Sequence, residues 1–148
     1  MRRSCQSSEN AVSYRSTMTI FRASAAPFRP VDAATFTGPA VVQRLAEDEA
    51  AVPVGVYRVR FEDGGRTHWH THSGPQWLLV VEGRIRVQRQ GEAPHDLVEG
   101  DAVVLSPNEK HWHGAVPGTT GAHIAVNVNL VTTWLEAVSE SEYQAVGG

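Results

Sequence analysis

The stretch from Gly64 to Gly83 constrains the fold of this chain more than any other part of the sequence. His70 and His72 lie two positions apart within it. On an extended strand, alternate side chains project from the same face, so both imidazole rings can reach one cation. The residues Ser73-Gly74-Pro75 then favour a turn, and an apolar run opens at Gln76. The stretch predicts a strand with two metal-binding side chains, followed by a strand that offers a third donor atom.

A second histidine pair, His111 and His113, has the same spacing. It follows Gly100–Pro107, a segment that predicts a strand and then a turn. A four-ligand site needs a donor from a distant part of the chain, and this pair is the candidate source. Neutral imidazole is a common ligand of divalent transition metals. The alternative is a set of structural or solvent-facing histidines.

The chain continues as short strands separated by turns. The segment Val54–Phe61 alternates, with Tyr57, Val59 and Phe61 on one face. The further expected strands are Gln76–Val81, Ile85–Gln88, His95–Val98, Ala102–Leu105, His111–Ala115 and His123–Leu130. Strands of this length and spacing predict an all-β fold, either a barrel or a jelly roll.

The only helical signal comes late in the chain. Thr132 or Thr133 can act as an N-terminal cap, and Glu136 falls in the first turn that would follow. The apolar residues that would form the stripe of this helix are Trp134, Leu135 and Val138. The segment predicts a short C-terminal helix packed on the outside of the barrel.

The expected strand His123–Leu130 separates polar from apolar side chains. One face carries His123, Ala125, Asn127 and Asn129, and the other carries four aliphatic residues. The polar face either meets water or lines the inside of a barrel. In a barrel, the aliphatic face needs cover from the C-terminal helix, another sheet or a second subunit, because long bare apolar faces invite association. We expect a homo-oligomer, a dimer or higher.

The composition excludes several classes of partner. The chain has 148 residues, 41% of them hydrophobic and 20% charged, which suits one domain with a single core. A net charge of −3 gives no basic footprint for nucleic acid, and no apolar run is long enough to span a membrane. The single cysteine, Cys5, cannot form an intrachain disulfide. A small-molecule partner and a cytoplasmic location are therefore expected.

The first 22 residues contain many serines and arginines and show no apolar periodicity. They predict a disordered leader, followed by one domain over residues 23–148. Arg2-Arg3 is followed by polar residues, which argues against a secretion signal. Met18 lies just before the domain, so translation from Met18 is an alternative hypothesis that N-terminal sequencing of the natural protein tests.

The two histidine blocks together resemble the paired motifs of the cupin superfamily. Over residues 64–83, the matching positions are Gly64, His70, His72, Gln76 and Gly83. Over residues 100–115, they are Gly100, Asp101 and His111. Gln76 replaces the usual Glu, and Ser106 and Asn108 replace a Pro and a Gly, although Asn also tolerates the left-handed conformation. The similarity runs from Phe36 to Tyr143 and extends to small bacterial single-domain cupins with a His-His-Gln-His metal site, among them manganese-dependent hydroxynitrile lyases.

The resemblance implies the cupin form of the jelly roll, a double-stranded β-helix. The implied metal ligands are His70, His72, Gln76 and His111. The implied residues of the substrate pocket are Tyr57, Val59, His123 and Asn127. Within this pocket His123 is the candidate for proton transfer, with His113 second.

The implied ligand set has consequences for the chemistry. Three imidazoles and one carboxamide are neutral, so the metal acts as a stronger Lewis acid than it would beside a carboxylate. Four ligands on an octahedral ion leave two positions open, which favours Mn(II) or Fe(II) over tetrahedral zinc. A substrate oxygen held there loses its proton more easily, and a nearby histidine can accept that proton.

Three functions remain open on the sequence. The first is a metal-dependent lyase or isomerase acting on a small hydroxylated or carbonyl substrate, of the hydroxynitrile lyase kind. The second is a cupin dioxygenase that uses Fe(II) and O2. The third is a non-catalytic domain that uses the metal to bind or sense a ligand. The neutral ligand set and His123 favour the first.

Overall fold

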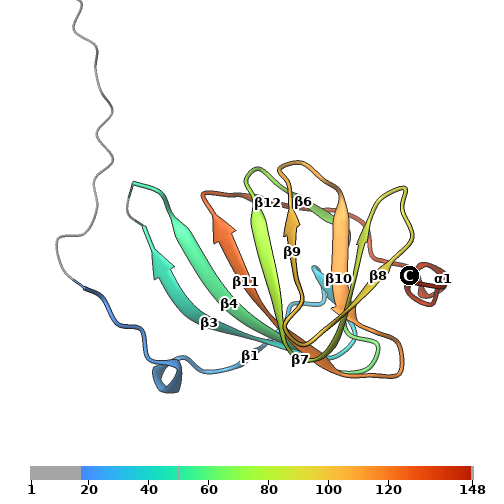
Figure 1. Cartoon of the computed structure of the whole chain (residues 1–148), viewed down its shortest axis with the longest axis horizontal. Coiled ribbons are helices and arrows are strands. Elements are labelled where there is room, and N and C mark those ends of the chain that lie inside the picture. The colour runs from blue at the N-terminus through green and yellow to red at the C-terminus, as the bar shows by residue number, and fades with distance from the viewer. Residues whose placement is uncertain (1–17, 50, 148) are drawn as a thin grey trace, which may run out of the picture.

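The computed structural model describes residues 18–49 and 51–147 (Figure 1). The predicted leader lies mostly outside these residues. Its last part, from Met18 to Arg22, is an exposed segment without regular structure. The expected single domain over residues 23–148 therefore stays a prediction at its N-terminal boundary.

The described residues form twelve strands, a single 3-10 turn and a short helix. The strands are β1 (Arg29–Pro30), β2 (Phe36–Thr37), β3 (Ala40–Asp48), β4 (Val54–Phe61), β5 (Arg66–Thr67), β6 (His70–His72), β7 (Gln76–Arg89), β8 (His95–Val98), β9 (Ala102–Leu105), β10 (His111–Ala115), β11 (Gly121–Val128) and β12 (Thr132–Trp134). The 3-10 turn is η1 (Ala23–Ala25), and the helix is α1 (Glu140–Tyr143). Among the described residues, no helix is long and apolar enough to cross a bilayer. The predicted all-β fold is confirmed.

The strands form one curled antiparallel sheet (Figure 1). Its main path runs β1-β3-β4-β11-β7-β10-β5-β2, with β8 and β9 also paired to β7. The first half of β7 pairs with β11 and β9, and its second half pairs with β10 and β8. The long strand β7 therefore joins the two halves of the barrel.

A bend at Gly83 lets β7 serve both halves. The sequence predicted two strands, Gln76–Val81 and Ile85–Gln88, but the structure has one continuous strand over this range. Gly83 has a φ of 58°, and a Cβ there would lie 2.1 Å from the carbonyl oxygen of Thr120. Only glycine fits this conformation and this close approach. The residues around Gly83, which predicted a turn between two strands, form a bend within one strand.

The interior of the barrel is filled from alternating faces of the strands. Phe61, Leu78 and Ile85 are fully buried. Tyr57, Val59 and Phe61 lie on one face of β4, as predicted. Val59 and Phe61 belong to one buried cluster, and Tyr57 packs against a second. The opposite face of β4 carries arginines that form ion pairs with Glu82. The predicted period-2 pattern of this strand is confirmed.

The C-terminal helix was predicted correctly in kind but not in position. Thr132–Trp134, where the cap was expected, forms β12, with Thr132 paired to His72 and Trp134 to His70. β-branched residues favour a pleated strand, and the edge of β6 offers it backbone partners. The helix begins after Ser139, whose hydroxyl accepts from the Glu142 backbone N–H in a capping box.

Two buried arginines fasten the C-terminal segment to the barrel. Arg86 donates to the carbonyls of Tyr143 and Ala145 at 2.8 and 2.7 Å, and to the carboxylate of Asp96 at 2.7 Å. The guanidinium of Arg66 donates to the carbonyl of Val138 at 2.9 Å and lies 4.3 Å from the centre of the Tyr143 ring. These contacts give the segment after β12 a fixed place against β5 and β7.

The helix leaves the outer face of β11 and β7 uncovered. It lies at the end of the molecule near β8, whereas β3, β4 and β11 lie at the other end (Figure 1). On the outer face Trp77 and Leu79 remain 52% and 44% exposed, and Val126 pairs directly with Trp77. The predicted homo-oligomer is one way to cover this face and stays a prediction.

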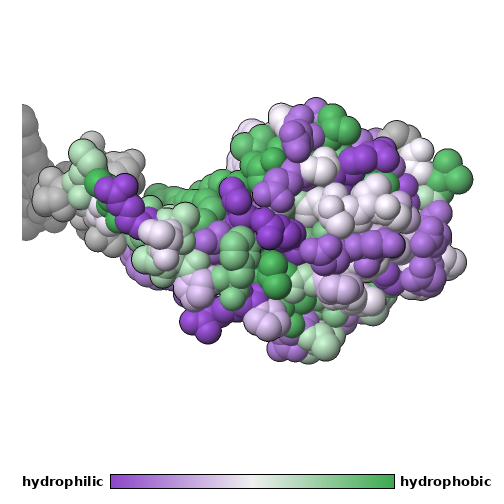
Figure 2. Space-filling model, turned by 90° about the horizontal axis from the view of Figure 1, so that it is seen from below, coloured by the Kyte–Doolittle hydropathy of each residue, from purple (hydrophilic) through white to green (hydrophobic). Residues whose placement is uncertain are grey.

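Figure 2 shows the opposite end of the molecule from β6 and β12. Polar side chains predominate over the barrel on this face. β6 and β12 lie at the other end of the barrel, away from this polar face.

Replacing Arg86 tests how the C-terminal segment is held. Arg86→Met leaves Asp96 without its buried partner and two carbonyls without a donor, so we expect the free energy of unfolding to fall by about 3–5 kcal/mol. Urea unfolding measures the loss. Arg89→Met is the matched control, because Arg89 is exposed and its ion pairs with Glu92 and Glu109 are screened by solvent, so its effect should be much smaller. Equal losses in both variants would contradict this account.

Candidate metal centre

A cavity of about 190 Å³ lies inside the barrel, and we call it the inner cavity. The predicted site residues that line it are Tyr57, Val59, His70, His72, Gln76, His113, His123 and Asn127. A larger cavity of about 450 Å³ lies beside it and shares Tyr57, Asn127 and Thr132 with it. The structure thus brings the predicted pocket residues together, with an outer space next to them.

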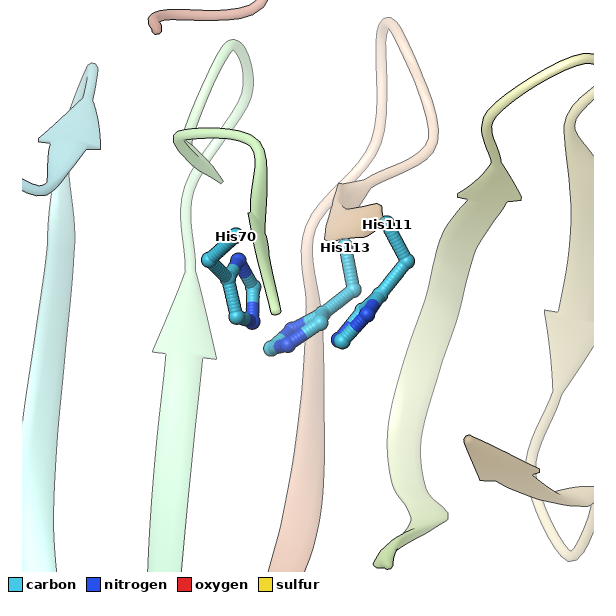
Figure 3. A group of neighbouring side chains, drawn as sticks. All are labelled: His70, His111 and His113. Carbon is cyan, nitrogen blue, oxygen red and sulfur yellow. The ribbon is translucent and has the colours of Figure 1, made fainter. Parts of the chain in front are cut away.

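The register of two strands places the histidine rings side by side. His111 on β10 pairs directly with His70 on β6. The ring centres of His70 and His111 lie 4.2 Å apart, and the His72 ring lies 4.8 Å from His70 and 4.9 Å from His111. Figure 3 shows His70, His111 and His113 turned toward one another between the two strands. Side chains directly opposite each other on neighbouring strands are close enough to share one ligand.

Backbone carbonyls select the tautomers of two histidines. Nδ1 of His70 lies 2.8 Å from the carbonyl oxygen of His68, and Nδ1 of His111 lies 2.8 Å from that of Glu109. A carbonyl oxygen only accepts, so each Nδ1 carries the proton and each Nε2 keeps its lone pair. This is the arrangement in which an imidazole offers Nε2 to a metal.

Several polar atoms near these rings are buried without a hydrogen-bond partner among the described residues. They are Nδ1 of His72, Oε1 of Gln76, and Nε2 of His111 and His113. A buried acceptor left unpaired costs about 1–3 kcal/mol, so native structures rarely retain such groups without a function. A cation between them would satisfy the lone pairs. The residues present therefore fit a divalent metal.

Two histidines compete for the third imidazole position. Nitrogens of His70, His111 and His113 all lie within 4.8 Å of one another, which makes His113 a possible ligand. The ring centre of His113, however, lies 5.3 Å from His70 and 5.8 Å from His111, farther than that of His72. Nδ1 of His113 is also engaged by His123. We favour His72, because its ring is nearer and because, unlike His113, it makes no hydrogen bond to another histidine among the described residues.

Burial keeps these histidines neutral. Burial, followed by the neighbouring His111, lowers the pKa of His70 well below its ordinary value and lowers the pKa of His72 to about 4. The pKa of His111 is lowered mainly by burial as well. Among the described residues that line the inner cavity there is no aspartate or glutamate, although for His111 the nearby Glu109 partly offsets the effect of burial on the pKa. Neutral imidazole is the form that binds metal, so the rings are ready at neutral pH.

His113 and His123 form a buried pair beside the cluster. Nε2 of His123 lies 2.9 Å from Nδ1 of His113, and the backbone N–H of His113 donates to the hydroxyl of Thr67 at 3.1 Å. Burial lowers the pKa of His123 to about 4 and that of His113 well below its usual range. Between two neutral rings only one proton is shared. One outer nitrogen of the pair is therefore an acceptor and the other a donor.

The sequence interpretation missed the part that Trp134 plays in the site. The Trp134 ring lies 4.6 Å from that of His70 and 5.9 Å from that of Phe36, and both aromatic residues line the inner cavity. Trp134 was assigned to a helical stripe. The two β-branched residues before it, Thr132 and Thr133, are the local signal for a strand that could have placed it correctly.

Comparison with known proteins identifies the class defined by this barrel and histidine cluster. Residues 57–128 match the family described as Cupin domain. The chain is 39% identical over 112 residues to an (R)-mandelonitrile lyase from Granulicella tundricola, and the match covers 74% of this chain and 86% of that protein. The chain belongs to the cupin family. The resemblance seen in the two histidine blocks is confirmed.

Solved structures agree with this assignment. A cupin-like protein from Thermotoga maritima superposes with a TM-score of 0.75 at 39% identity, covering 78% of this chain and 90% of that protein. A polyketide cyclase from Streptomyces resistomycificus superposes with a TM-score of 0.66 at 18% identity, covering 86% and 92% of the two chains. The second likeness is one of fold alone.

Metal titration of two single variants distinguishes the competing histidines. His72→Ala should weaken Mn(II) binding by more than about 100-fold, beyond what loss of a supporting residue causes, because it removes a ligand. His113→Ala should weaken it by less than about 10-fold, because its effect is indirect. Competition with a chromophoric chelator measures both affinities, and circular dichroism checks the fold. The reverse order would make His113 the ligand.

Proposed function

We propose that the chain is a metal-dependent lyase that cleaves small hydroxynitriles. The observation that carries the proposal is the neutral His113–His123 pair, which lies in the same inner cavity as the unpaired ligand atoms of His72 and Gln76. Similarity to an (R)-mandelonitrile lyase at 39% identity supports the same reaction class. The proposed ligands are His70, His72, Gln76 and His111, and the proposed metal is Mn(II) or Fe(II).

The metal and the His113–His123 pair have different roles in the proposed reaction. When bound, the divalent metal supplies Lewis acidity, which lowers the pKa of a hydroxyl group next to it. A histidine nitrogen of the His113–His123 pair accepts the hydroxyl proton. The C–O bond then becomes a carbonyl while the bond to the nitrile carbon breaks, and cyanide leaves with the bonding electrons. A proton returned to cyanide completes the reaction.

The histidine pair is suited to both proton steps. Nδ1 of His123 and Nε2 of His113 are both buried without a partner among the described residues. A proton accepted at one outer nitrogen can be matched by release from the other, because the shared proton shifts across the 2.9 Å bond. His123 is the proposed base and His113 its partner. Their low pKa values keep both rings neutral at pH 7, so one outer nitrogen of the pair retains a lone pair for the hydroxyl proton.

The walls of the inner cavity suit a small, partly apolar substrate. Val59, Ala125 and Trp134 supply apolar surface, and Tyr57 and Asn127 stand where the inner cavity meets the larger outer one. Displacing water from such a site strengthens the electrostatic interactions inside it. Tyr57 and Asn127 are therefore the proposed pocket residues at the entrance.

Replacing His123 tests the proposed base. His123→Ala should keep the metal but reduce turnover of (R)-mandelonitrile by about 100- to 10,000-fold, the range typical of removed acid–base groups. Release of benzaldehyde measures the rate, and elemental analysis confirms that the metal is retained. His123→Gln fills more of the space left by the imidazole, so it controls for an effect of lost side-chain volume. A normal rate in both variants would show that His123 only lines the pocket.

Oxygen dependence separates this proposal from the other two functions. A lyase turns over equally well with and without O2, whereas a dioxygenase needs both Fe(II) and O2. A binding or sensing domain would hold the hydroxynitrile without turning it over. Parallel aerobic and anaerobic assays on one purified sample of known metal content distinguish the three.

A further inference from the structure

The amide of Gln76 presents a problem of orientation that a carboxylate would not. The two ends of an amide have almost the same shape, but only the oxygen can bind a cation, whereas the NH2 group is a donor. Either oxygen of a glutamate at this position could serve as the ligand. A glutamine ligand therefore needs a neighbour that determines which end faces the metal.

Asn127 is that neighbour in the structure. It pairs with Gln76 across β11 and β7, so the two side chains leave adjacent strands at the same level. Nε2 of Gln76 donates to Oδ1 of Asn127 at 2.7 Å. Oε1 of Gln76 is buried and has no hydrogen-bond partner among the described residues. The side chain of Gln76 thus has its nitrogen engaged and its oxygen free within the cavity that His70 and His72 line.

We infer that Asn127 is a positioning residue that holds the Gln76 amide with its oxygen toward the metal. The inference rests on the proposed metal centre and adds a role for a residue so far treated as pocket lining. Without the acceptor at Asn127, Nε2 of Gln76 would lose its buried partner, and the amide could rotate to place either end toward the cation. Asn127 therefore determines how effectively a neutral side chain serves as a ligand.

A double-mutant cycle on Mn(II) affinity tests the inference. Asn127→Ala should weaken Mn(II) binding by about 10- to 100-fold in the natural background, the range for residues that support a ligand. In the Gln76→Glu background, Asn127→Ala should change the Mn(II) affinity by no more than about twofold, as for independent sites. The reason is that either oxygen of a carboxylate can bind the metal. Isothermal titration with Mn(II) alone measures all four affinities on the full chain.

Two further variants make the test specific. Asn127→Asp still accepts from Nε2 of Gln76 and cannot donate to its oxygen, so it should bind Mn(II) at least as tightly as the natural protein. Gln43→Ala is the matched control, because it removes a buried amide that donates to the carbonyls of Ala23 and Ala26, outside the inner cavity, and it should leave the Mn(II) affinity unchanged.

The outcomes separate this inference from the proposed function. If Asn127→Ala lowers the Mn(II) affinity equally in both backgrounds, or in neither, the positioning role is wrong. The proposed metal centre is not affected by that result. A natural protein that binds no Mn(II), or binds it equally well after His70→Ala, overturns both. We expect Asn127→Ala to lower the Mn(II) affinity in the natural background alone, and Asn127→Asp to keep the affinity of the natural protein.

Discussion

The direct pairing of His70 with His111 across β6 and β10 is the constraint on which the rest of the site depends. Side chains alternate along a strand, so a slip of one residue would turn one ring away from the other. β6 has only three residues, and it is held on its other side by β12. The C-terminal segment that the buried arginines fasten thus also supports the histidine cluster, through the short strand that precedes it.

Much of the fold follows from local alternation. The strands Val54–Phe61, Ala102–Leu105 and His111–Ala115 have the predicted bounds, because their apolar spacing and flanking turns are local signals. β12 was missed because Thr132–Trp134 is short, and its partner β6 lies far earlier in the chain, so that pairing has no local signature. Gly83 looked like a break because a bend inside a ladder and a turn between strands use the same residue.

The His-x-His spacing and the cupin motifs lead to residues that lie close together in the fold, but not to Trp134 or to the contacts between them. His70, His72 and Gln76 line the inner cavity, and the ring of His111 lies beside those of His70 and His72. The tautomers of His70 and His111 depend on carbonyls two residues earlier, and the Gln76–Asn127 bond depends on a register that shifts at a bulge between Ala122 and His123. Such contacts are properties of the folded barrel. Gln76 departs from the usual glutamate, and we propose that a second amide, that of Asn127, orients it toward the metal.

We propose that β6, β10 and the start of β7 together hold one metal ion with neutral ligands. A crystal structure of the protein grown with Mn(II), with anomalous scattering collected at the manganese edge, tests this proposal. We predict one anomalous peak at bonding distance from Nε2 of His70 and His111, a ring nitrogen of His72 and Oε1 of Gln76. A peak bonded to His113 in place of His72, or one that faces Nε2 of Gln76, would contradict the account.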